Sequence, residues 1–155
     1  MKARFSFLLL IVIVMAGCAD PNTVIDRNLE LPNHNWSYVN KLKYDVKIDD
    51  EAAVYNIYFN LRVTADYKYS NIFILLHRGG NGKKIDTNRY EFKLANPNGE
   101  WLGAGSGNLY TYQFPLLNQF KFPAKGTYHF EIEQNMRDNP LREINDAGLR
   151  IEKAK

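Results

Sequence analysis

The chain has 155 residues, with 20 basic and 17 acidic side chains, a formal net charge of +3 and one cysteine. This length predicts one domain of ordinary size, able to bury roughly two thirds of the surface of its unfolded chain. The nearly balanced charge gives no concentrated basic face of the kind that binds a phosphate backbone, so nucleic acid is not expected as a partner. A single cysteine excludes a disulfide within the chain.

The first eighteen residues have the pattern of a lipoprotein signal peptide. Lys2 and Arg4 precede a run from Phe5 to Ala16 that is apolar except at Ser6. Twelve helical residues rise about 18 Å, which is too short for a hydrocarbon core of about 30 Å. The run therefore predicts a cleaved secretory signal over residues 1–17 and not a membrane span.

The end of this run, Met15-Ala16-Gly17-Cys18, resembles a bacterial lipobox, although leucine is usual where Met15 stands. In that motif the cysteine sulfur takes a diacylglycerol, the peptide is cut before the cysteine, and the new amine is acylated. We therefore predict lipidation at Cys18, with no cofactor beyond the covalent diacylglycerol and acyl chain on it. Without Lys2 and Arg4, 18 of the 20 basic residues remain against 17 acidic ones, a charge near +1.

Residues 18–41 are a mixed tract with two prolines, five asparagines and few apolar residues. This composition predicts a lipidated tether that leads into a docked segment, with Trp36 at the edge of the core. The folded domain is then expected over residues 42–155.

From residue 42 the apolar residues recur with a period of two, which is typical of half-buried strands. Leu42–Ile48 and Tyr55–Thr64 alternate most regularly, whereas 71–78 is apolar at both parities and predicts a central strand covered on both faces. Trp101–Asn108 is glycine-rich and predicts an irregular or bulged edge. Further strands are expected at 85–94, 110–114, 128–132 and around 149–151, separated by turns at 79–82, 96–99 and 123–126.

Seven or eight strands with no convincing helix after the signal predict an all-β fold, a single antiparallel β-sandwich of jelly-roll-like type. Gly126-Thr127-Tyr128 also resembles a tyrosine corner, in which a tyrosine hydroxyl bonds to the backbone a few residues upstream. No internal repeat or second domain is visible.

Enzyme signatures fail on spacing, which predicts a protein that is not an enzyme. The glycines around Ser106 are not placed as in a nucleophile elbow, and Gly82-Lys83-Lys84 lacks the hydroxyl of a P-loop. The three histidines, His34, His77 and His129, share no metal-ligand spacing, so no metal site is expected. Glu131 and Glu133 could form a carboxylate pair and Asp49–Glu51 a calcium loop, but a charged outer face is the favoured interpretation of both.

The aromatic residues exceed what a core clearly needs, since tyrosine and phenylalanine total 19. Exposed rings on a sheet bind sugars or protein partners. We predict a partner-binding surface formed by Trp101, Glu100, Tyr110 and Tyr112, with Trp101 as its anchor. The alternative for the same rings is a carbohydrate-binding module at the cell envelope.

Several segments together resemble the GldH family, the gliding-motility-associated lipoproteins of Bacteroidetes. They are YNIYFNLR at 55–62, YSNIFILL at 69–76, ANPNGEWLGAG at 95–105, FEIEQNMR at 130–137 and DAGLRIEK at 146–153. The resemblance implies an envelope lipoprotein that acts with other lipoproteins of a gliding or associated secretion machine. It implies no catalytic residue, and Cys18 is the one functional position that it carries over. Ala19-Asp20-Pro21 lacks the acidic cluster of many surface-exposed lipoproteins, which favours a periplasm-facing domain.

Overall fold

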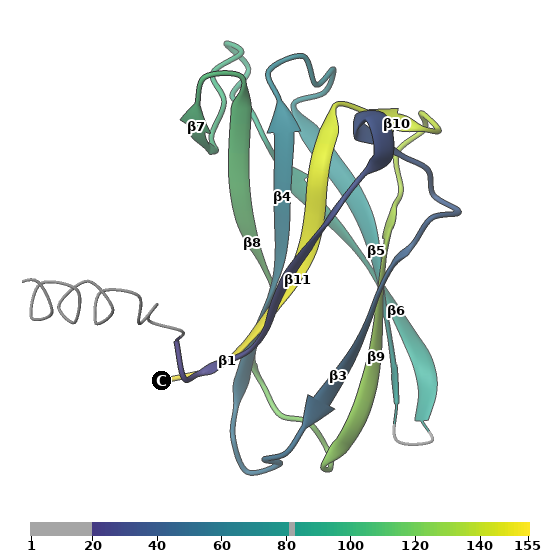
Figure 1. The fold of residues 1–155 in the computed structure, drawn as a ribbon, viewed down its shortest axis with the longest axis vertical. Helices are drawn as coiled ribbons and strands as arrows, with labels where there is room; N and C mark the ends of the chain where they lie inside the picture. Colours follow the sequence, from purple (N-terminus) through teal and green to yellow (C-terminus); the bar gives the residue numbers. More distant parts are fainter. Residues whose placement is uncertain (1–19, 81–82) are drawn as a thin grey trace, which may run out of the picture.

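The computed structural model describes residues 20–80 and 83–155, so the signal peptide and Cys18 lie outside the described residues. The described chain is nearly all β, with two antiparallel sheets that face each other as two layers (Figure 1). One sheet has five strands, in the order β1 (Thr23–Glu30), β11 (Ile144–Lys153), β4 (Tyr55–Thr64), β8 (Leu109–Phe120) and β7 (Ala104–Ser106). The other has four, in the order β3 (Leu42–Ile48), β9 (Gly126–Gln134), β5 (Asn71–Gly80) and β6 (Lys83–Lys93). A short ribbon of β2 (Asn35–Trp36) and β10 (Leu141–Arg142) and a 3-10 turn at Pro32–His34 complete the fold.

One hydrophobic core lies between the two sheets. In β3 every second residue is buried, and the odd-numbered residues of β4 from Tyr55 to Val63 all point inward. Phe59 of β4 stacks on Phe92 of β6 across the core, with ring centroids 5.9 Å apart. These contacts confirm the predicted antiparallel β-sandwich.

The strand predicted to be covered on both faces is covered on one. In β5, Ile72, Ile74 and Leu76 are fully buried, whereas Phe73 on the outer face is half-buried. The guanidinium of Arg89 lies 4.0 Å from the centroid of the Phe73 ring. A cation–π contact of this kind shields an apolar ring without a second layer of structure, which explains the unbroken apolar run.

Residues 23–30, predicted to belong to a tether, form the edge strand β1 instead. This strand pairs with β11 in a register that places Asp26 opposite Arg150. None of its eight side chains is buried, so its apolar alternation is weak. Trp36, expected at the core edge, is fully buried, and its indole N–H donates to the carbonyl of Asn40 at 3.2 Å. The described domain therefore begins at the base of β1 and not at residue 42.

A polar network covers the outer face of the five-stranded sheet. The carboxylate of Asp146 has no exposed surface and accepts hydrogen bonds from Arg62 at 2.5 Å and from Asn28 at 2.8 Å. Asn60 donates to Asp26 at 2.9 Å and accepts from Gln113 at 3.0 Å. The hydrogen bond from Arg62 to Asp146 raises the pKa of that guanidinium. The network links β1, β11, β4 and β8 through side chains on this face.

Two predicted strands are longer than the sequence indicated. The strand expected at 110–114 is β8, of twelve residues, and the one expected around 149–151 is β11, of ten residues in the middle of the sheet. Pro115 in β8 coincides with an irregular register against β4, which explains why its alternation ends early.

The predicted tyrosine corner is present. The hydroxyl of Tyr128 donates to the carbonyl of Ala124, four residues upstream, at 2.8 Å. The same hydroxyl accepts from the N–H of Ala124 at 3.3 Å, so the turn into β9 is held at both backbone groups.

Gly148 of β11 lies against β1 with no room for a side chain. A Cβ atom there would lie 2.5 Å from the carbonyl oxygen of Arg27 and 2.1 Å from Oδ1 of Asn28. We predict that Gly148→Ala lowers the free energy of unfolding by about 1–3 kcal/mol, because overpacking forces β1 away from β11. Urea unfolding followed by circular dichroism measures the change.

Gly79→Ala is the matched control for this prediction. The nearest atom to its added Cβ would be Cγ1 of Ile85, at 3.2 Å, and because this side chain is exposed it can move aside, so the variant should lose much less stability than Gly148→Ala. Equal stability of the two alanine variants would contradict the close approach of β1 to β11.

Candidate interaction surface

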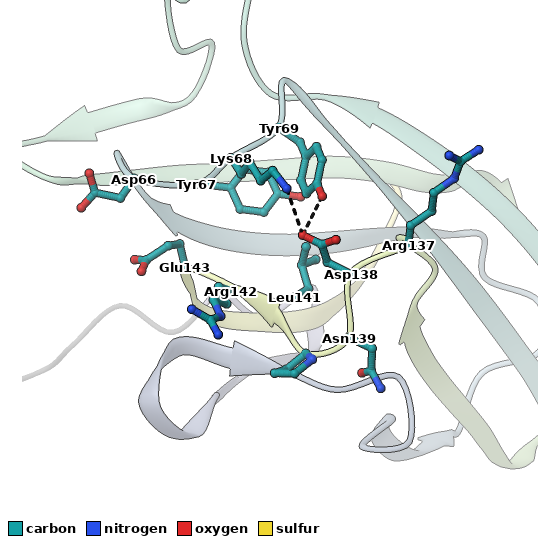
Figure 2. A pocket seen from close by; sticks show the side chains of 11 residues that line it. Asp66, Tyr67, Lys68, Tyr69, Arg137, Asp138, Asn139, Leu141, Arg142 and Glu143 are labelled. Atoms are coloured by element: carbon teal, nitrogen blue, oxygen red, sulfur yellow. Dashed lines mark hydrogen bonds and ion pairs between the residues drawn. The ribbon is translucent and has the colours of Figure 1, made fainter.

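A cavity lies at the end of the sandwich that carries β10, the upper end in Figure 1. It has a volume of about 610 Å³ and is formed by two loops, residues 66–69 between β4 and β5 and residues 137–143 around β10. Figure 2 shows the two loops facing each other across the hollow. These loops are about 70 positions apart in the sequence, and the fold brings them together.

Asp138 joins the two loops. Its carboxylate accepts a hydrogen bond from the hydroxyl of Tyr69 at 2.6 Å and pairs with the ammonium of Lys68 at 3.5 Å (Figure 2). The Tyr69 hydrogen bond, together with the charge of Lys68, holds the pKa of Asp138 below its ordinary value. The hydrogen bond with Tyr69 and the charge of Asp138 raise the pKa of Lys68. The carboxylate is therefore ionised near neutral pH and ties the loops together.

Buried residues form the wall of the cavity. The ring of Tyr67 is buried, packs edge-on against Tyr69 with centroids 5.9 Å apart, and donates its hydroxyl proton to the carbonyl of Asn71 at 3.1 Å. Burial raises the pKa of Tyr67, so the phenol stays neutral. Beside it, the Thr64 hydroxyl donates to the carboxylate of Glu143 at 2.6 Å. The cavity is thus held by specific hydrogen bonds.

Two guanidinium groups at the cavity, those of Arg137 and Arg142, make no side-chain hydrogen bond within the described residues. Arg137 and Arg142 are exposed, and neither donates a hydrogen bond to a residue of the described chain. Lys68 shares its charge with Asp138, and the carboxylate of Asp66 has no hydrogen bond within the described residues. With three acidic and three basic residues around it, the cavity suits a polar or charged partner surface and not an apolar ligand.

The structure places three of the four predicted surface residues at the same end of the molecule. Trp101 and Tyr110 are half-buried and stack with ring centroids 5.3 Å apart, and Glu100 is exposed. Tyr112 was predicted wrongly, because its ring is buried and its hydroxyl donates to the carbonyl of Leu94 at 2.8 Å. It belongs to the core and cannot contact a partner.

The glycine-rich run explains how these rings lie. A Cβ at Gly105 would be 2.7 Å from the ring of Tyr110, and one at Gly103 would be 2.6 Å from the ring of Tyr112. The two glycines thus let aromatic rings lie directly on the backbone. The short β7 is an edge strand, as the sequence predicted for this segment.

The aromatic stack adjoins the charged cavity. The N–H of Ala65, beside the cavity loop, donates to the carbonyl of Asn108 at 3.0 Å, and the N–H of Leu94 donates to the carbonyl of Ser70 at 2.7 Å. We call this end, with the cavity loops 66–69 and 137–143 and the Trp101–Tyr110 stack, the distal surface. The sequence pointed to the stack but not to the cavity, since the two cavity loops are far apart in the chain and meet only in the folded structure.

The other candidate residues are engaged in the sheets. Burial works to raise the pKa of Glu133, but hydrogen bonds from Lys41 and His77 outweigh it and lower the pKa. Glu131 pairs with Lys41 and Lys43, each at 3.7 Å. Glu131 and Glu133 therefore belong to a charged outer face of the sheet, which is the interpretation that the sequence favoured.

The remaining histidines and carboxylates lie apart. His129 pairs with Asp45, and His34 lies in the 3-10 turn. Asp50 of the predicted calcium alternative pairs with Lys153 at 3.0 Å. Within residues 20–80 and 83–155, no three histidine, cysteine or acidic side chains are grouped as metal ligands. The same residues include no helix of the length and hydropathy needed to cross a membrane.

The geometry defines a class of protein, a small antiparallel sandwich with a charged cavity and a stacked pair of aromatic rings at one end. The family model for the GldH lipoprotein matches residues 23–151. The chain is 30% identical to a protein named gliding motility lipoprotein GldH homolog, from Christiangramia forsetii, over 99% of each chain. It is 27% identical to the gliding motility lipoprotein GldH of Flavobacterium johnsoniae, over 98% of each chain. No solved structure is significantly similar to it.

The chain therefore belongs to the GldH lipoprotein family. The match runs from the first residue of β1 to within two residues of the end of β11, so it covers both sheets and the distal surface. The resemblance stated from the sequence is confirmed.

The link between the two cavity loops yields a prediction. We expect Asp138→Asn to increase hydrogen–deuterium exchange in residues 66–69, because the charged partner of Tyr69 and Lys68 is lost. The loss of global stability should be small, because solvent screens the ion pair between Asp138 and Lys68. The matched control is Asp66→Asn at the same rim, which should exchange as wild type. Equal exchange in the two variants would contradict the assigned role of Asp138.

Proposed function

We propose that the protein is a lipoprotein anchored through Cys18, which acts without catalysis by contributing a contact surface to an envelope complex of a gliding or associated secretion machine. The domain faces the periplasm, and its partners are other envelope lipoproteins of that machine. The names of the two curated relatives, both gliding motility lipoproteins, support the process.

The observation that carries the proposal is the separation of the anchor from the distal surface. Asp20 already contacts the fold, since its carboxylate lies 3.8 Å from the guanidinium of Arg150 in β11. Two residues span at most about 7 Å, so an acylated Cys18 holds the base of β1 close to the bilayer. The base of β1 lies on the left side of the lower half of Figure 1, whereas β7 and β10 lie at the upper end. A surface at that end points away from the anchor and is accessible to a partner.

The chemistry of the distal surface also supports protein contact. Stacked aromatic rings and exposed arginines are enriched where proteins bind each other. Trp101 is stacked on Tyr110 and is half-buried, so it offers an edge and one partly exposed face. Because this stack and the exposed guanidiniums of Arg137 and Arg142 occur at the same end of the domain, a protein partner is favoured over a sugar ring.

Replacing the anchor residue in the cell tests the proposal. We predict that Cys18→Ser leaves an uncut, unlipidated precursor, and that gliding and the associated secretion fail as they do on deletion of the gene. Electrophoretic mobility, metabolic labelling with a fatty acid and motility assays measure these outcomes.

Met15→Leu is the matched control, since it brings the motif closer to a lipobox and should be processed normally. Normal membrane partitioning of a Cys18→Ser protein would contradict the anchor. Unchanged gliding, secretion and levels of partner proteins after gene deletion would contradict the proposed process.

A further inference from the structure

A second cavity, of about 320 Å³, lies at the lower end of the sandwich in Figure 1, between the end of β8, the start of β9 and the end of β5. We call it the basal cavity. Four of its nine lining residues are aromatic and two are charged, whereas six of the residues around the distal cavity are charged. The residues that carry the argument are Phe120, Phe122, Pro123, Tyr128, Phe130 and Arg78.

The aromatic rings of the basal cavity hold one another in place. Phe122 packs edge-on against Phe120, with centroids 4.9 Å apart, and against Tyr55 at 5.1 Å. Its ring also lies 4.6 Å from that of Tyr128, whose hydroxyl is fixed by the tyrosine corner. The cavity is therefore preformed.

A cation lies at the mouth of the basal cavity. The guanidinium of Arg78 lies 5.3 Å from the centroid of the Phe120 ring and pairs with Asp86. Its Nε is buried and has no hydrogen-bond partner within the described residues. Lys121 and Lys125, beside Phe120 and Phe122 in the chain, are exposed. Three cationic side chains thus lie beside the apolar hollow, and the charge of Arg78 is paired with that of Asp86 in the lining.

The basal cavity and the first described residues share one end of the molecule. The carbonyl of Asn22 accepts from the N–H of Lys153 at 2.8 Å, and the N–H of the next residue, Ala154, donates to Val54 at 2.8 Å. Tyr55 follows Val54 and packs on Phe122 of the cavity. The side chain of Asn56 accepts from the N–H of Gln119, the residue before Phe120, at 3.0 Å.

We propose that this end of the sandwich rests on the anchoring bilayer and that the basal cavity takes up lipid from it. The inference rests on the proposed anchor at Cys18, whose short link holds the base of β1 against the membrane. An aromatic hollow flanked by lysines has the composition of protein surfaces at a membrane interface, where rings enter the acyl boundary and cations meet anionic headgroups. A second membrane contact also fixes the orientation of a lipid-anchored domain.

The other surface beside the N-terminus does not suit a lipid. The outer face of the five-stranded sheet carries Asp26 and Glu152, both already paired with Arg150, and an amide network with its hydrogen bonds satisfied. Contact with a bilayer would desolvate these groups without new partners. The basal end is therefore the surface that faces the membrane.

Fluorescence quenching from within the bilayer tests the proposal. The acylated full-length protein is reconstituted in vesicles of phosphatidylethanolamine and phosphatidylglycerol, some of them containing lipids with a nitroxide on the upper acyl chain. Since the sulfur of Cys18 is taken up by diacylglycerol, a single introduced cysteine can be labelled with a fluorophore. Lys121→Cys reports on the basal end, and Glu100→Cys, also at an exposed position, reports on the distal surface.

We expect the nitroxide lipids to quench the label at Lys121→Cys several-fold more than the label at Glu100→Cys. Adding Phe120→Ser should reduce this quenching, whereas Leu102→Ser, an apolar-to-serine change at an exposed position remote from the basal cavity, should not. The proposal would be overturned if both labels were quenched equally. It would also be overturned if Phe120→Ser left the quenching of the Lys121→Cys label unchanged.

Flotation of the same vesicles separates this proposal from the proposed anchor. If the protein floats with the vesicles and the basal label is not quenched, the anchor stands and the basal contact is refuted. If the protein does not float, the anchor at Cys18 fails and the basal contact fails with it.

Discussion

The pairing of β1 with β11 is the constraint on which the arrangement of the molecule depends. The first strand of the described chain lies against the last from Thr23 to Glu30, in continuous register from Ile25 onward. Gly148 allows this approach by leaving space for the backbone of Arg27. The carboxylate of Asp146, buried beneath Asn28 and Arg62, ties β1 to β11 and β4. Release of β1 would remove the Asn28 hydrogen bond from this buried carboxylate, a loss of about 1–3 kcal/mol, so the network disfavours it.

Because β1 is part of the sheet, the N-terminal link is short and the domain has two unlike ends. The lower end in Figure 1 has an aromatic cavity flanked by cations, close to the first described residues. The upper end has a charged cavity and the Trp101–Tyr110 stack. A long tether would let the domain turn freely and give these ends no fixed relation to the membrane. A two-residue link, together with a basal contact, would direct the distal surface outward.

The sequence predicted the parts of the fold that follow from alternation. The strands Leu42–Ile48 and Tyr55–Thr64 have the predicted bounds, because one face of each strand is buried in the core. The sequence did not predict β1, because an edge strand with no buried side chain shows no alternation of apolar and polar residues. Tyr112 was misplaced because its strand was recognised but the inward face of the strand was not. The cavity loops meet through tertiary structure alone, which no local spacing reveals.

The central claim is that the distal surface is where the protein meets its partner, and photocrosslinking in cells tests it most directly. A photoreactive amino acid at Arg142 or Glu100, on the distal surface, is compared with one at Lys43, which is equally accessible on the outer face of the four-stranded sheet. The account predicts that Arg142 and Glu100 form a discrete adduct with an envelope protein and that Lys43 does not. Adducts from Lys43 alone, or equal adducts from all three positions, would contradict it.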